Sequence, residues 1–108
     1  MEQDQNQILQ TKLSDIFYWA SINLRQVRFR VGNLEKKEAC ASGAINYFLS
    51  QGKCIKLRDI KKTYPITRKR IVKFKEKNFH KMSIMIFLND WLGIKFEKLA
   101  KLCKRFNW

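Results

Sequence analysis

The sequence predicts an all-α fold, a small helical domain of about five or six helices, and three observations predict it. The chain of 108 residues has only four Gly and one Pro, so few residues interrupt helices. Apolar residues recur at steps of three and four along most of the chain. Hydrophobic residues make up 45% of the composition, which is enough for a packed core. We expect residues 1–108 to form a single domain, with a flexible segment at residues 1–6.

The first predicted helix covers the N-terminal part of the chain. Its apolar residues have helical spacing; they are Leu9, Leu13, Ile16, Phe17, Ala20, Leu24, Val27 and Val31. The end of this helix stays open, because residues 27–31 also alternate between apolar and charged side chains, as in a strand. Gly32 and Asn33 end the element in either case.

A second helix is predicted for residues 35–51, with Gly52 as its C-terminal stop. Its centre, residues 39–45, has small or apolar side chains on nearly every side. Because small side chains allow neighbouring helices to approach closely, we expect this helix to be the central and most buried one.

Two further helices are predicted after residue 79. Residues 82–92 should form a buried helix that Gly93 ends. The final helix should bury one face, formed by Ile94 or Phe96 with Leu99, Leu102, Cys103 and Phe106. Lysines and an arginine occupy its opposite face; they are Lys95, Lys98, Lys101, Lys104 and Arg105.

Positive charge is concentrated in one quarter of the chain. Residues 53–81 hold 12 Lys and Arg against only Asp59 and Glu76, a net charge of +10 out of +14 for the whole chain. Such an excess opposes compaction unless a polyanion neutralises it. The concentration in one segment favours a binding surface and makes nucleic acid the expected partner.

The residues that characterise enzymes, disulfide-linked proteins, metal-binding proteins and membrane proteins are missing from the sequence. There is no Gly-rich phosphate loop and no nucleophile beside a histidine, so we expect no catalytic residues, no cofactor and no enzymatic activity. Cys40, Cys54 and Cys103 are odd in number and widely spaced, and His80 is the only histidine, which predicts no disulfide framework and no metal site. The longest apolar run, residues 84–88, is too short to span a membrane. We expect an intracellular protein without a membrane partner, located in a nucleus or nucleoid.

Residues 57–76 resemble the helix-turn-helix motif of DNA-binding proteins. Pro65 should end the first motif helix, because it cannot continue one and pushes Tyr64 toward extended geometry. The matching positions are Leu57 and Ile60 in the first helix, Ile66 filling the turn, Thr67 as the cap, and Ile71 and Phe74 on the inner face of the second helix. The sequence departs from the motif at Pro65, where Gly is common, and at Lys61, where Ala is common. The predicted helical domain thus contains a helix-turn-helix.

A longer segment carries a second resemblance. Residues 39–77 resemble a cyclin-box repeat of the transcription-factor-IIB type, in which a buried Ala-rich helix precedes a helix-turn-helix-like pair. Ala39, Ala41, Ala44 and Ile45 match that buried helix, and Tyr47 falls near its usual aromatic position.

The helix-turn-helix resemblance implies a way of binding double-stranded DNA, which we expect to be preferred over RNA. The second motif helix would enter the major groove, with Arg68, Lys69, Arg70 and Lys73 as base-contact candidates. Arg68 and Arg70 are best suited to guanine. The phosphate-contact candidates are Lys53, Lys56, Arg58, Lys61, Lys62, Thr67, Lys75, Lys77 and Lys81. DNA binding could be sequence-specific or sequence-tolerant, in a transcription, replication or DNA-modification accessory factor.

A second hypothesis is a non-catalytic structural subunit of a larger ribonucleoprotein or DNA-modifying complex. The basic segment would then dock RNA or an acidic partner, and the aromatic-rich remainder would form the interface. We therefore expect a protein partner or a homo-oligomer as well. Most of the aromatic side chains should nevertheless belong to the core, with Trp19 and Trp108 as exceptions, since neither has to lie on an inner face.

Overall fold

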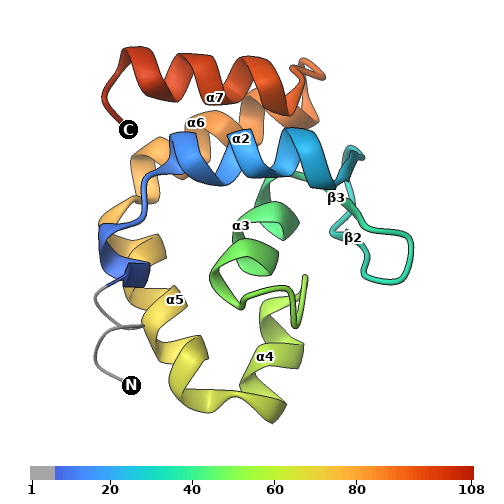
Figure 1. The fold of residues 1–108 in the computed structure, drawn as a ribbon, viewed down its shortest axis with the longest axis vertical. Coiled ribbons are helices and arrows are strands. Elements are labelled where there is room, and N and C mark those ends of the chain that lie inside the picture. Colours follow the sequence, from blue (N-terminus) through green and yellow to red (C-terminus); the bar gives the residue numbers. More distant parts are fainter. Residues whose placement is uncertain (1–6) are drawn as a thin grey trace.

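A computed structural model describes residues 7–108, so the predicted flexibility of residues 1–6 lies outside the described part of the chain. The fold is mainly helical, with a small three-stranded sheet (Figure 1). Residues 7–10 are helical, and they are followed by α2 (Leu13–Asn23), β1 (Arg25–Gln26), β2 (Gly32–Asn33), β3 (Glu38–Ala39), α3 (Ala41–Leu49), α4 (Leu57–Thr63), α5 (Pro65–Lys77), α6 (Phe79–Asp90) and α7 (Phe96–Arg105). The helical class is confirmed, but an all-α fold is not.

Strands β1 and β3 occupy residues that were predicted to be helical, whereas β2 is formed by Gly32 and Asn33, which were predicted to end the first element. β3 lies in the middle, parallel to β1 and antiparallel to β2. The first long helix therefore ends at Asn23, not near Val31, and the second begins at Ala41, not at residue 35. A turn explains the change, because the Asn33 side-chain oxygen accepts a hydrogen bond from the Lys36 amide at 3.2 Å. The chain thus returns beside β1 before α3 can start.

Helix α3 is the centre of the fold, as predicted. Ala41, Ala44 and Ile45 are fully buried, and α3 packs against α2, α6 and β3. Gly43 allows a close approach, since a Cβ atom there would meet the backbone oxygen of Val31 and the side chain of Ile55. Small residues in this helix therefore bring its neighbours close, which was the basis of the prediction.

Helices α2 and α7 lie side by side above α3 (Figure 1). The rings of Phe17 and Phe96 stack between them, with centroids 6.1 Å apart. Leu99 and Cys103 of α7 are fully buried, which confirms most of its predicted inner face. The predicted burial of Phe106 is wrong. This side chain is 56% exposed, because α7 ends at Arg105 and Phe106 is its C-cap.

Helix α6 differs from the fully buried helix that was predicted. Met82, Met85 and Asn89 are buried on one face. Ile84 and Phe87 are 45% and 52% exposed, because the long apolar run extends around the helix onto the side that no other described element covers. The prediction of burial is therefore wrong for the outer half of this helix.

The side-chain amide of Gln26 joins β1 to both C-terminal helices. Its Nε2 donates to Oδ1 of Asn89 at 2.8 Å and to the carbonyl oxygen of Ile94 at 2.6 Å. Its Oε1 accepts a hydrogen bond from the Phe96 amide at 2.7 Å, at the start of α7. Buried Asn89 in turn donates to the Val27 carbonyl oxygen at 3.3 Å. This network fixes the end of α6 and the start of α7 on the sheet.

Helices α4 and α5 form a pair at the end of the molecule away from α7 (Figure 1). Tyr64 alone separates them, and Pro65 is the first residue of α5, a position that proline favours because it needs no amide hydrogen. The predicted turn and cap are therefore wrong: Ile66 is 66% exposed, and Thr67 lies inside the helix. Ile71 and Phe74 point inward as predicted.

Candidate nucleic-acid interface

The cations of residues 53–81 lie almost entirely outside ion pairs. Within residues 7–108, only Arg58 of these twelve side chains forms one, with 3.9 Å between its Nε and Oδ1 of Asp59. The exposed acids of the fold are too few in this region to neutralise the rest. The α4–α5 pair with its flanking residues thus presents a surface that attracts anions.

The four predicted base-contact residues do not share one face of α5. Lys69 and Lys73 are exposed and lie one turn apart, so they form an outer ridge. Arg68 and Arg70 are half-buried, and a separation of two residues turns their side chains about 200° apart around the helix axis. The two arginines therefore lie on opposite flanks of α5 and cannot read the same base step together.

One flank of α5 faces a pocket between α3, α4 and α5, which we call the cationic pocket. Its volume is about 460 Å³, and it is lined by Val31, Ser42, Asn46, Lys56, Leu57, Arg58 and Lys75. Arg68 lies on the same flank of α5 as Lys75. Burial, and next the nearby charge of Arg68, lower the pKa of Lys75. Three predicted phosphate-contact residues are thus brought together: Lys56, Arg58 and Lys75.

The other flank of α5 faces the N-terminal residues. Lys77 lies there, and its Nζ donates a hydrogen bond of 3.4 Å to the carbonyl oxygen of Leu9. Arg70 lies two turns before Lys77, and its buried Nε has no hydrogen-bond partner within residues 7–108. This flank thus joins α5 to the helical residues 7–10.

The remaining phosphate-contact candidates are scattered around the α4–α5 pair. Lys61 and Lys62 are exposed on α4, so Lys61 does not occupy the packed position that the motif gives to Ala. Lys53 holds its Nζ 4.6 Å from the ring centroid of Tyr64, a cation–π contact. Thr67 on α5 and Lys81 on α6 are half-buried.

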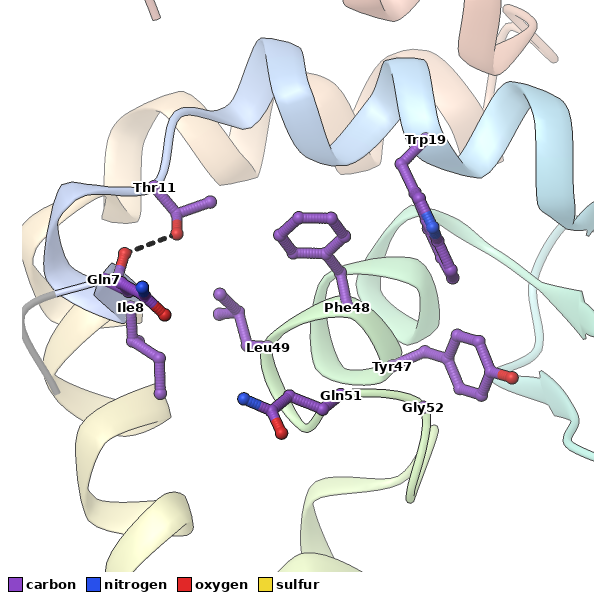
Figure 2. A pocket seen from close by; sticks show the side chains of 9 residues that line it. All are labelled: Gln7, Ile8, Thr11, Trp19, Tyr47, Phe48, Leu49, Gln51 and Gly52. Atoms are coloured by element: carbon purple, nitrogen blue, oxygen red, sulfur yellow. Dashed lines mark hydrogen bonds between the residues drawn. The ribbon is translucent and has the colours of Figure 1, made fainter. Parts of the chain in front are cut away.

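A second, uncharged cavity lies between residues 7–11, α2 and α3 (Figure 2). Its volume is about 560 Å³; Trp19 reaches from α2 toward the rings of Tyr47 and Phe48, which are 5.4 and 5.5 Å from it between centroids. Trp19 was expected to stand apart from the core, and it is half-buried here. The partners Tyr47 and Phe48 were not predicted, because the fold alone brings the end of α3 beneath α2. This cavity has no cation with which to bind phosphate.

The thiols, the possible metal ligands and the helix lengths bear on other kinds of site. Burial raises the pKa of Cys40 and of Cys54, and it raises that of Cys103 to about 12, so the thiolate form is disfavoured. Residues 7–108 contain no cluster of three or more His, Cys, Asp or Glu that could bind a metal ion. Over the same residues, every helix is too short or too polar to cross a bilayer.

Comparisons with protein-family models, curated proteins and solved structures returned no match for this chain.

Proposed function

We propose that this protein binds nucleic acid through the phosphate backbone, with double-stranded DNA preferred over RNA and the α4–α5 pair as the contact surface. One observation carries the proposal: of the twelve cations in residues 53–81, eleven lie outside ion pairs within the described residues. Their counter-charge must come from solution ions or from a polyanion, and release of those ions favours binding to a polyanion.

Helix α5 is the element that we propose faces the DNA. Lys69 and Lys73 on its outer ridge would contact phosphates, and Lys61 and Lys62 on α4 would extend the contact. In this proposal α4 and α5 would act as the two helices of the helix-turn-helix resemblance, without the turn and cap of that motif. Because Arg68 and Arg70 lie on opposite flanks, we favour sequence-tolerant binding over recognition of a particular base sequence.

A role as an accessory subunit is the second candidate, and a separate surface favours it. Ile84, Phe87 and Trp91 are exposed along one side of α6, and Phe29 packs its ring edge-on to Trp91, with centroids 5.2 Å apart. An apolar stripe of this kind is typical of a protein–protein contact. This stripe lies outside residues 53–81, so an accessory subunit could bind DNA and a protein partner together.

The experiment compares a duplex, a single strand and a structured RNA of equal length by fluorescence anisotropy. A double variant, Lys69→Ala with Lys73→Ala, should weaken duplex binding about tenfold or more, by removing two phosphate contacts. The matched control removes two exposed lysines from α7, Lys98→Ala with Lys104→Ala, and should have a much smaller effect. Equal losses in both variants would mean that net charge alone attracts DNA and would contradict a defined surface.

A further inference from the structure

We propose that the cationic pocket between α3, α4 and α5 binds a phosphomonoester, and that the terminal phosphate of a nucleic-acid strand is its ligand. The inference rests on the proposed function and adds to it a specific site for the end of the strand. Lys56, Arg58 and Lys75 supply the charge, and Ser42 and Asn46 supply polar groups at the wall of α3.

Two helices, α4 and α5, bring the cations together. Lys56 is the N-cap of α4, Arg58 lies in the first turn of that helix, and Lys75 comes from the last turns of α5. The only carboxylate in an ion pair with any of these three, within residues 7–108, is Asp59, at 3.9 Å from Arg58. The pocket therefore has an excess of positive charge that suits a dianion.

The α3 wall of the pocket has unused hydrogen-bonding capacity. Asn46 is 3% exposed, and its Nδ2 donates to the Ile55 carbonyl oxygen at 2.8 Å. That carbonyl can only accept, so the orientation of the amide is fixed. The Oδ1 atom of Asn46 has no donor within the described residues, although buried polar atoms nearly always have a partner. Because Oδ1 is closed to solvent, a sugar hydroxyl or a water molecule could supply the missing donor only if the Asn46 side chain moves when the ligand binds.

Lys75 is half-buried without a carboxylate to pair with it in residues 7–108. Its position costs free energy, since burial and Arg68 both disfavour its charged form. A phosphate in the pocket would remove this cost by supplying the opposite charge. The half-buried ammonium group of Lys75 does not stabilise the fold, and a bound phosphate would account for its position.

The charge of the pocket favours a phosphomonoester over a phosphodiester. A terminal phosphate has a charge of about −1.5 to −2 at pH 7, whereas a phosphate within a strand has one negative charge and a sugar on each side. The pocket is open to solvent, so the three cations around it, and not enclosure by its walls, favour the dianion. Val31 and Leu57 supply apolar surface for the sugar beside the phosphate.

The experiment measures the affinity of the full chain for two duplexes that differ only in a 5′-phosphate or a 5′-hydroxyl. The duplex with the 5′-phosphate should bind at least about fivefold more tightly than the duplex with the 5′-hydroxyl at the same salt concentration. Lys75→Met should abolish this preference, and it should weaken binding of the 5′-hydroxyl duplex no more than the loss of any other single cation of the α4–α5 pair. The matched control Lys73→Met removes a charge from the outer ridge of the same helix, so it should weaken both duplexes equally and keep the preference.

Failure of this inference can be told from failure of the proposed function. Equal binding of both duplexes by the native chain, or a preference that survives Lys75→Met, overturns the pocket and leaves DNA binding intact. A third titration uses a nucleoside 5′-monophosphate alone, observed by NMR shifts of the Ser42 and Asn46 amides. If neither duplex binds but the monophosphate shifts these amides in the native chain and not in Lys75→Met, the phosphomonoester site stands with a free nucleotide as its source, and the proposed function fails. If neither the phosphorylated duplex nor the monophosphate shifts these amides, the site is refuted.

Discussion

Arg68 and Lys75 lie two turns apart on the same flank of α5, and the charge of Arg68 adds to burial in lowering the pKa of Lys75. Neither forms an ion pair within residues 7–108. Two like charges on one partly buried flank destabilise the folded chain. This arrangement is understandable if an anion binds there.

Replacing Lys75 should therefore stabilise the free protein. Lys75→Met keeps the apolar stem and removes the half-buried ammonium group, so the desolvation cost and the repulsion by Arg68 both disappear. A gain of about 0.5 kcal/mol would raise the melting temperature by about 2–4 °C, measured by circular dichroism. Lys73→Met, at an exposed position, should leave it unchanged. A lower melting temperature for Lys75→Met would mean that its charge stabilises the fold.

The buried thiol of Cys103 should make stability fall at alkaline pH. Its pKa is about 12 in the folded chain, against an ordinary value of 9.0, so above pH 9 the unfolded chain loses a proton that the folded chain keeps. The unfolded state then binds fewer protons, and the loss reaches about 1.4 kcal/mol by pH 10. Urea unfolding between pH 8 and 10.5 measures how steeply the free energy of unfolding falls with pH. Cys103→Ala should make this slope shallower, with Cys40 and Cys54 accounting for part of what remains, and an identical slope in the variant would contradict the pKa shift.

The sequence predicted those features that depend on local pattern. The helical spacing of apolar residues predicted α2 and the inner face of α7, and the small side chains predicted the buried centre of α3. Each of these features follows from the sequence of one segment alone. The strands β1 and β3 could not be predicted in this way, since two-residue strands are specified by partners distant in the chain. Gln26 and Asn89 were missed for the same reason, because 63 positions separate the two amides that form the bond.

The candidate site was predicted in composition but not in geometry. The excess of Lys and Arg in residues 53–81 is visible directly, and all twelve lie in or beside the α4–α5 pair. Lys75 lies one turn after the buried Ile71 and is therefore half-buried, and Ile66 is exposed because it lies in the first turn of α5 instead of filling a turn between helices. The cationic pocket also needs Ser42 and Asn46 from α3, which no local pattern connects with Lys75.

The Gln26–Asn89 hydrogen bond should be important for stability. Asn89→Ala would leave the Gln26 amide and the Val27 carbonyl oxygen without their buried partner, which should cost about 1–3 kcal/mol in urea unfolding. Gln26→Ala should cost a similar amount. The double variant should lose clearly less than the sum, because both changes remove the same bond. Strict additivity would show that the two side chains do not act together.

Adding one methyl group to Gly43 should destabilise the fold. A Cβ at this position would meet the Val31 backbone oxygen, which cannot move as a flexible side chain could. Gly43→Ala should therefore lower the free energy of unfolding by about 1–3 kcal/mol, even though Ala favours helices. Ser83→Ala, at an exposed position of α6, is the control and should be nearly neutral. A Gly43→Ala protein as stable as the native one would refute the close packing of α3.

The salt dependence of duplex binding tests the central claim most directly. If about six phosphates are contacted, a plot of log K against log salt concentration should have a slope of about −5. Lys62→Ala removes one exposed cation of α4, so it should make the slope shallower by about one unit and weaken unrelated duplexes equally. A native slope shallower than about −2, or a slope that Lys62→Ala leaves unchanged, would contradict binding of the phosphate backbone by the α4–α5 surface.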